Sequence, residues 1–283
     1  MKLQFVSAYC IMLAIGLTLG ACRQESKLVG NLKFDNITLE ESQHLFADNG
    51  KPHAEVKVDF SFVKESTDDK MKDSINHMLQ TLVFGEKFST QTPQDAVRAF
   101  TDNYFSTYRH DLEPMYRDEV ATSGSEPDEV WYSYEREAQT KVEYYDKHLL
   151  TYRLYMEEFT GGAHPVYFTY FQNIDLRTLK QIELNDLLIG EYDEELTEML
   201  IAQLMEDTGA ETKDDLEEMG YGTTAEIIPT ENFKLAPGGI SFLYNIYEIA
   251  PYVIGPVEID LSFKQLDPIL NTEYMIIKEL KGK

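Results

Sequence analysis

The residue types in this chain that could perform chemistry are six histidines and 50 aspartates and glutamates. The histidines include no His-Glu-x-x-His motif and no pair at the spacing of metal ligands. The sequence also lacks the G-x-S-x-G motif of hydrolases and the phosphate-binding P-loop. Among 50 carboxylates, some pair resembles a glycosidase dyad by coincidence. We therefore predict no catalytic residue, no metal site and no cofactor. The histidines are His44, His53, His77, His110, His148 and His164.

His164 is the histidine in the most suggestive surroundings, because it lies within Gly161-Gly162-Ala163-His164-Pro165. Two glycines and a proline predict a turn at this point. Two interpretations remain open. Either the backbone of the turn satisfies the imidazole, or the imidazole assists a glycan-acting hydrolase that uses carboxylates as acid and base. We favour the turn.

The first 21 residues predict a secretory signal peptide. Lys2 precedes an uncharged, apolar stretch, and Gly20-Ala21 supplies the small residues of a cleavage site. Residues 19–22, Leu-Gly-Ala-Cys, resemble the bacterial lipobox, so we expect Cys22 to be lipidated and residues 22–30 to form a tether. The alternative is a retained membrane helix, since the uncharged stretch is long enough to span a bilayer. The lipoprotein interpretation places the chain in a bacterial cell envelope, outside the cytoplasm and anchored to the membrane only through lipid.

The cysteine count limits the chemistry further. Cys10 falls within the expected leader and Cys22 at the lipidation site, and the sequence has no other cysteine. We therefore expect no disulfide, no thiolate nucleophile and no cysteine-ligated metal in the mature domain.

The balance of charges is strongly acidic, with 25 lysines and arginines against 50 aspartates and glutamates and a net charge of −25. Such a chain repels phosphate backbones, which argues against nucleic acid and anionic lipid as partners. Between Asp186 and Glu218 there are 13 acidic residues and a single basic one, Lys213. This stretch predicts a solvated helix face. A docking surface for a cationic partner, or a weak calcium site, is the alternative.

The hydrophobic pattern predicts an α+β fold, in which an antiparallel meander packs against amphipathic helices and two halves are intimately joined. Asn49-Gly50 predicts a tight turn, and a capping box at Ser66–Asp69 and a cap at Thr92 with Pro93 predict two helix starts. Apolar stripes predict helices over 66–82, 92–108 and 192–204, the last ending at Gly209 after a turn capped by Asn185. Strands are expected at 32–46, 54–62, 130–132, 142–145, 149–159, 166–174, 240–244, 257–263 and 274–277.

Several motifs resemble a pair of domains of unknown function from the bacterial envelope. The motifs are residues 161–165 (GGAHP), 173–176 (NIDL), 182–187 (IELNDL) and 242–252 (FLYNIYEIAPY), with Gly255 just after. The pair occurs in the extracellular region of the lysozyme-sensing anti-sigma factor (RsiV-like) and as an accessory region of some peptidoglycan deacetylases. The resemblance covers most of the chain from Leu32 to Leu270. We therefore divide the mature chain into an N-terminal α+β domain at 31–163 and an RsiV-like C-terminal α+β domain at 164–283.

The resemblance implies binding of a lysozyme-like protein or a cell-wall component. The family's sigma-binding segment and deacetylase domain have no counterpart here, so neither signalling nor deacetylation is implied. The expected function is a non-catalytic, lipid-anchored binding module. The alternatives are a structural or assembly lipoprotein without a ligand, and a glycan-acting hydrolase. The candidate residues, with a ligand-binding or a structural role, are Gly161, Gly162, His164, Asn245, Tyr247, Glu248 and Tyr252.

Overall fold

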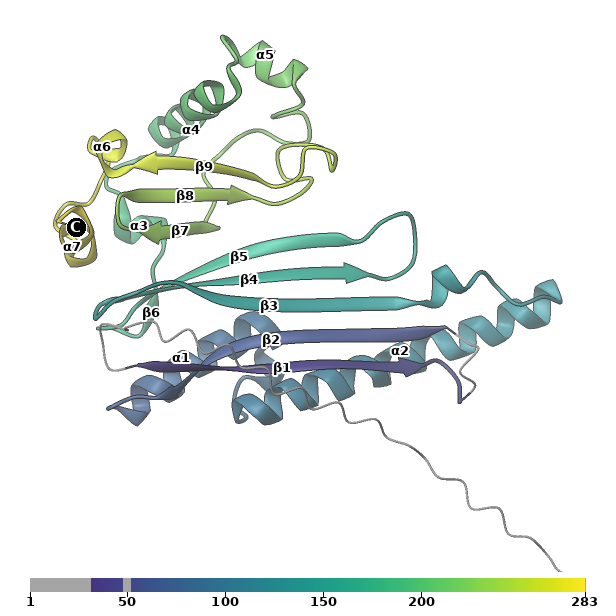
Figure 1. The fold of residues 1–283 in the computed structure, drawn as a ribbon. Helices are drawn as coiled ribbons and strands as arrows, with labels where there is room; N and C mark the ends of the chain where they lie inside the picture. The colour runs from purple at the N-terminus through teal and green to yellow at the C-terminus, as the bar shows by residue number, and fades with distance from the viewer. Residues whose placement is uncertain (1–31, 48–51, 283) are drawn as a thin grey trace, which may run out of the picture.

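A computed structural model describes residues 32–47 and 52–282, and the leader, Cys22, the tether and the Asn49-Gly50 turn lie outside them. Strands and helices of the described chain are arranged in two sheets with packed helices (Figure 1), which confirms the predicted α+β class. The strands are β1 (Lys33–His44), β2 (His53–Glu65), β3 (Tyr134–Tyr145), β4 (Leu149–Phe159), β5 (Val166–Asp175), β6 (Lys180–Gln181), β7 (Phe233–Ala236), β8 (Gly239–Tyr244) and β9 (Val257–Ser262). The helices are α1 (Asp69–Phe84), α2 (Pro93–Ser123), α3 (Leu184–Leu187), α4 (Asp193–Thr208), α5 (Lys213–Glu218), α6 (Phe263–Leu266) and α7 (Met275–Lys281), with short 3-10 helices at Glu86–Phe88 and Glu129–Tyr132.

The larger sheet contains β1 to β6 in sequence order. Its neighbouring strands are antiparallel except β2 and β3, which are parallel. The parallel pair needs a crossover, and α1 and α2 provide it between the end of β2 and the start of β3. From β3 to β5 the chain runs as the predicted antiparallel meander.

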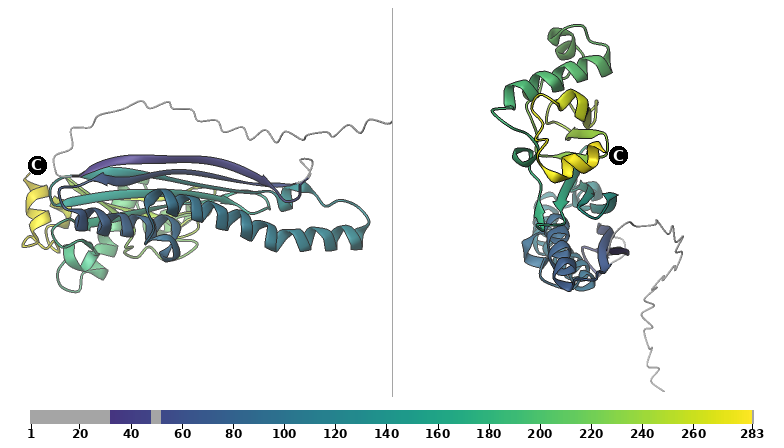
Figure 2. Two further views of the ribbon diagram at one scale, coloured as in Figure 1. Left: turned by 90° about the horizontal axis from the view of Figure 1, so that it is seen from below. Right: turned by 90° about the vertical axis from the view of Figure 1, so that its left-hand side faces the viewer.

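The two crossover helices cover one face of this sheet (Figure 2). Alternate residues of β2, among them Val58 and Phe60, are buried in one hydrophobic cluster with Ile75 of α1 and Phe105 of α2. The alternation is what a half-buried strand requires, because successive side chains point to opposite faces. Along α2 the helix continues to Ser123, well beyond the predicted end, and its last turns project past the strands (Figure 2).

The smaller sheet, β7-β8-β9, and helices α3 to α7 form the other half of the molecule. Their side chains build a second hydrophobic cluster, which includes Phe242 of β8 and Leu200 of α4. Strand β4 contributes to both clusters, since Leu149 belongs to the second and Leu150 to the first. The halves are therefore intimately joined, as predicted from the sequence, and β4 is the strand that packs into both clusters.

Two expected strands are helical instead. Residues 130–132 lie in the 3-10 helix Glu129–Tyr132. Asp128 caps the start of this helix, because its side chain accepts a hydrogen bond from the Val130 amide. The strand prediction was wrong because it rested on three strand-forming residues in a row. In the structure only Tyr132 of the three is buried, and Trp131 is 58% exposed. Residues 274–277 fall at the start of α7, where Ile276, Ile277 and Leu280 are buried together. Leu280 follows Ile277 by three residues and Ile276 by four, the spacings that place side chains on one helical face.

The helix starts were predicted partly correctly. Thr92 caps α2 and Pro93 is its first residue, as expected. Asp68, in place of Ser66, caps α1, accepting from the amides of Lys70 and Met71. Glu183, in place of Asn185, caps the short helix α3, where its side chain and that of Asp186 form a capping box. In each corrected case a neighbouring acidic side chain reaches the free amides of the first turn.

The acidic stretch from Asp186 to Glu218 includes the second half of α3 and all of α4 and α5. Asp193, Glu194 and Glu195 occupy the first turn of α4, where the helix dipole favours negative charge, and α4 ends at Gly209 as predicted. Across residues 32–47 and 52–282, no helix has both the length and the apolar character needed to cross a bilayer.

Candidate functional site

Two loops at the same end of the molecule hold most of the predicted site residues. One is the loop 160–165 between β4 and β5, and the other is the segment 245–256 between β8 and β9 (Figure 1). The first loop reverses direction at Gly161 and Gly162, whose φ angles of +83° and +116° suit residues without a Cβ. In the second loop, Tyr247 has a φ of +68°, an uncommon value for a residue with a side chain.

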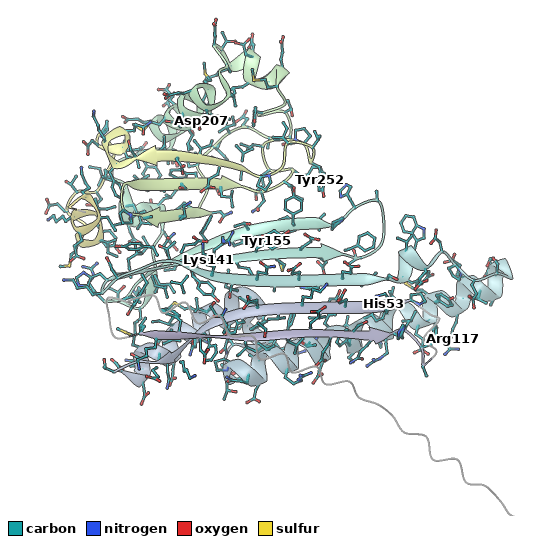
Figure 3. The ribbon with its side chains drawn as sticks, in the orientation of Figure 1. His53, Arg117, Lys141, Tyr155, Asp207 and Tyr252 are labelled. Carbon is teal, nitrogen blue, oxygen red and sulfur yellow. The ribbon has the colours of Figure 1, made fainter. Side chains whose placement is uncertain are left out.

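Five rings from the two halves form a connected group, which we call the aromatic cluster. Its members are Tyr155, His164, Tyr167, Tyr247 and Tyr252. The imidazole of His164 stacks on the ring of Tyr252 with 4.0 Å between centroids. Tyr252 also contacts Tyr167 at 5.8 Å and Tyr247 at 5.7 Å, and Tyr167 lies 6.4 Å from Tyr155. Tyr252 is thus the hub that joins the small sheet to the β4–β5 hairpin (Figure 3).

Hydrogen bonds fix the orientation of His164. Its Nδ1 lies 2.9 Å from the carbonyl oxygen of Pro165, which also accepts from the Tyr252 hydroxyl at 3.2 Å. Because a carbonyl can only accept, Nδ1 carries the proton, and Nε2 of the neutral ring is an acceptor. The Tyr247 hydroxyl lies 3.5 Å from Nε2, at the long limit of a hydrogen bond. The backbone partner is the one expected for a turn histidine.

Strand register brings the two remaining tyrosines together. Tyr155 pairs with Thr169 and Glu157 with Tyr167, so all four side chains lie on the sheet face that bears the small sheet. The Tyr155 hydroxyl donates to Glu157 at 2.6 Å. Burial and this hydrogen bond raise the pKa of Tyr155, and burial raises the pKa of Tyr252. Both phenols therefore stay protonated, and remain hydrogen-bond donors, at physiological pH.

Trp131 adds a further exposed ring beside the aromatic cluster. The 3-10 helix that carries it packs against the hairpin so closely that a Cβ on Gly161 would lie 3.0 Å from the Trp131 carbonyl oxygen. A Cβ on Gly162 would lie 3.9 Å from the indole ring. Trp131 is 58% and Tyr247 49% exposed, and His164 is also exposed. Together with the cluster, Trp131 forms what we call the aromatic surface.

Asn245 and Glu248 have a different place, at the joint between the halves, where Asn245 is buried and Glu248 is exposed. Asn245 is 1% exposed, and its side-chain amide accepts from the Thr169 amide at 2.7 Å and donates to the Thr169 carbonyl at 3.2 Å. Glu248 accepts from the Asn245 amide at 2.7 Å. The free edge of β5 is thereby satisfied by a side chain from the other half.

Sequence reasoning missed four residues of this region. Asn232 repeats the action of Asn245, accepting from the Phe171 amide at 2.9 Å and donating to the Thr169 carbonyl at 2.8 Å. No local pattern marks it. Tyr155 and Tyr167 could have been found from the alternation of β4 and β5, and Trp131 as the chain's single tryptophan.

The arrangement offers recognition chemistry: ring faces, phenolic donors and the carboxylates of Glu157 and Glu248. Over the described ranges 32–47 and 52–282, no group of three or more His, Cys, Asp or Glu side chains could hold a metal ion. Ring faces beside carboxylates suit a cationic or amphipathic surface, through cation–π contacts and charge-assisted hydrogen bonds.

Comparison with known proteins places the chain in a family. Residues 185–264 match the family described as "Protein of unknown function (DUF3298)". No curated protein matches the chain. The crystal structure of a DUF3298 family member from Bacteroides fragilis is 42% identical with a TM-score of 0.86, covering 91% of this chain and all of that one. A DUF3298 family protein from Pseudomonas aeruginosa is 18% identical with a TM-score of 0.55, covering 84% of this chain and 95% of that one, and shows the shared fold alone. On the strength of the Bacteroides relative and the matched segment, this chain belongs to the DUF3298 family.

Proposed function

We propose that this protein is a non-catalytic, lipid-anchored binding module of the bacterial cell envelope, and that the aromatic surface is its recognition surface. The resemblance of its motifs to the RsiV-like anti-sigma factor and to deacetylase accessory regions supports an envelope role. The signal peptide and the lipidation of Cys22 belong to the same proposal, and they rest on the pattern of residues 1–22.

The exposure of the aromatic surface is the observation that carries the proposal. Large aromatic side chains normally bury their rings, and exposed groups of them mark binding sites. Here Trp131 and Tyr247 are about half exposed, although ring stacking and backbone contacts hold the two loops beneath them. Tryptophan and tyrosine are also the residue types that dominate binding energy at interfaces.

A cationic protein of the lysozyme type is the partner that charge and resemblance favour, and a cell-wall component is the alternative. The chain's net charge of −25 attracts basic proteins over a distance and speeds encounter. Charge alone attracts any basic protein, so specificity must come from the aromatic surface. Arginine and lysine side chains of a partner would contact the tyrosine faces and the neighbouring carboxylates.

The test compares two equally basic proteins by titration calorimetry, lysozyme and cytochrome c, at low and at physiological salt. A specific partner loses affinity as salt rises but still binds, because an interface also buries apolar area. Tyr247→Ala and Trp131→Ala should each weaken binding to lysozyme about tenfold or more, the loss typical of an interface hot spot. Met275→Ala, at an exposed position on α7, is the matched control and should change nothing.

Two outcomes would contradict the proposal. Equal binding of lysozyme and cytochrome c, lost together as salt rises, leaves only nonspecific attraction. Equal affinity of the aromatic variants and the Met275 control removes the aromatic surface as the binding site. The anchor is tested separately, since Cys22→Ser should move the protein from the detergent to the aqueous phase in a phase-partition assay.

A further inference from the structure

Three large apolar side chains are exposed on the β8–β9 loop and on the segment between α5 and β7. Met219 and Ile228 are about half exposed, and Val253 is 89% exposed. Within residues 32–47 and 52–282, no other large apolar side chain is as exposed as Val253. Single exposed apolar residues are common on protein surfaces, so these three matter only if the chain holds them together.

The segment after α5 and the β8–β9 loop lie side by side at one end of the small sheet (Figure 1). A Cβ on Gly220 would lie 2.8 Å from the side chain of Ile254, so the loop leaves no room for a side chain at that position. The Gly222 amide donates to the Ile249 carbonyl at 2.7 Å. These contacts place the backbone of Met219 beside the β8–β9 loop.

Ile228 is held near the start of the same loop. The Tyr244 hydroxyl, at the end of β8, donates to the Ile228 carbonyl at 2.6 Å. Beneath these segments, Tyr221 and Ile254 pack against the second hydrophobic cluster. The three exposed side chains are therefore carried by backbone that is fixed on a packed core, and we call them the loop patch. A surface that is rigid before binding loses less conformational entropy when a partner binds.

The surroundings of the loop patch are acidic. From Asp214 to Phe263 the chain has nine acidic residues and one basic residue, Lys234, which pairs with Glu258 at 2.7 Å. Two of the acidic residues, Glu218 and Glu226, are exposed and lie within two residues of the loop patch in the sequence. A partner that carries lysine or arginine beside apolar side chains is the complement of such a surface.

We propose that the loop patch binds a cationic amphipathic polypeptide segment. The apolar side chains of that segment would pack on the loop patch, and its lysines or arginines would pair with the neighbouring glutamates. A second copy of this chain is a poor occupant, because two molecules with a net charge of −25 repel each other. The inference is separate from the aromatic surface and needs no lysozyme-type partner.

The test measures the binding of three labelled peptides to residues 23–283 by fluorescence anisotropy, in buffer without detergent. This span contains every described helix and strand, and a crystallised relative that matches 91% of the chain shows that such a span folds on its own. The first peptide consists of two Lys-Leu-Ala-Lys-Leu-Ala-Lys repeats, which form a cationic amphipathic helix. The second has glutamate in place of lysine, and the third has glycine in place of leucine. The first should bind saturably and the others at least about tenfold more weakly, because each lacks one half of the match.

Matched variants then locate the binding site. Val253→Ser should weaken binding of the first peptide about tenfold, and the exposure of Val253 means that the fold does not depend on it. Met275→Ser removes an exposed apolar side chain on α7 and should change nothing. Glu226→Gln should weaken binding about threefold, whereas Glu198→Gln, which removes the same charge from α4, should not.

The proposal is overturned if the first peptide does not bind saturably, if either altered peptide binds as tightly, or if the control variants weaken binding as much as the patch variants. Trp131→Ala should leave peptide binding unchanged, and a tenfold loss would assign the peptide to the aromatic surface and also overturn the proposal. Sedimentation of the free protein tests the second copy. A dimer that Val253→Ser dissociates would show that a second copy, and not a cationic segment, occupies the loop patch.

Discussion

The side-chain amide of Asn245 takes the place of a neighbouring strand for Thr169. It accepts from the Thr169 amide at 2.7 Å and donates to the Thr169 carbonyl at 3.2 Å, across 76 residues of sequence. In a sheet these two backbone groups would pair with the next strand, but β5 meets β6 only at its last residues, Ile174 and Asp175. The bond therefore both satisfies a strand edge and fastens the small sheet to the large one.

Replacing Asn245 should lower the free energy of unfolding. Asn245→Ala leaves the Thr169 amide without its acceptor, while the Thr169 carbonyl keeps its hydrogen bond from Asn232, and we expect a loss of about 2 kcal/mol in urea denaturation. Asn245→Asp should also destabilise, because a carboxylate accepts from the Thr169 amide but cannot donate to its carbonyl. As a control, Asn103→Ala on the exposed side of α2 should cost under about 0.5 kcal/mol. Equal losses at the two positions would mean that the joint carries no special stability.

The sequence predicted those helices and strands whose structure is determined by residues close together in the chain. Strand β2 could be predicted because Val58 and Phe60 alternate with polar residues, and the start of α2 because Thr92 and Pro93 are adjacent. Residues 130–132 and 274–277 were misjudged because strand-forming residues also occur in short helices. Burial by the rest of the molecule decides between the two structures there.

Only part of the candidate site could be predicted from the sequence, because several of its residues are far apart along the chain. The glycines of the β4–β5 loop and the position of His164 followed from turn chemistry. The stacking of His164 on Tyr252 joins residues far apart in the sequence, and nothing in either segment encodes the other. The same holds for Asn232, which directly precedes β7 and whose partners Thr169 and Phe171 lie in β5 of the larger sheet.

Gly161 should tolerate a side chain less well than Gly162. Both have positive φ angles, so alanine is strained at either position by about 1 kcal/mol. At Gly161 the new Cβ also lies 3.0 Å from the Trp131 carbonyl, whereas at Gly162 the nearest atom is 3.9 Å away. We expect Gly161→Ala to cost about 2 kcal/mol and Gly162→Ala about 1.

The fluorescence of Trp131 gives that comparison a local readout, since the chain has no other tryptophan. Displacement of the 3-10 helix by Gly161→Ala should shift the emission maximum, and Gly162→Ala should leave it nearly unchanged. Identical spectra and identical stabilities for the two variants would contradict close packing of the hairpin on the 3-10 helix.

Protonation of Asp175 should make the free energy of unfolding depend on pH in the acid range. It is 2% exposed and accepts from Arg177 at 2.5 Å and from the Tyr274 hydroxyl at 2.9 Å. Burial alone would raise its pKa, but the hydrogen bonds from Arg177 and Tyr274 outweigh it and hold the pKa below the usual 3.8. A lowered folded-state pKa contributes stability that is complete above the unfolded-state pKa and is lost as the pH falls through the folded value.

The measurement is urea unfolding of the wild type and Asp175→Asn at neutral pH and at about pH 3. At neutral pH the variant should be about 2 kcal/mol less stable, because it loses the ion pair with Arg177. In acid the gap should narrow, since protonation weakens the same pair in the wild type. A gap that stays constant or widens in acid would mean that the Asp175 carboxylate does not supply this stability.

Limited proteolysis with subtilisin should leave the joint between the halves intact. The meander from Tyr144 to Ile174 is hydrogen-bonded on both sides of β4 and feeds both hydrophobic clusters. Two segments belong to no strand and bury little. They are residues 121–127, which include the exposed end of α2, and residues 220–229 between α5 and β7. A protease needs a locally extended, accessible chain, so the first cuts should fall in these two segments. Mass spectrometry of the earliest fragments checks this, and early cleavage between Tyr144 and Ile174 would show that the halves separate more easily than a shared strand allows.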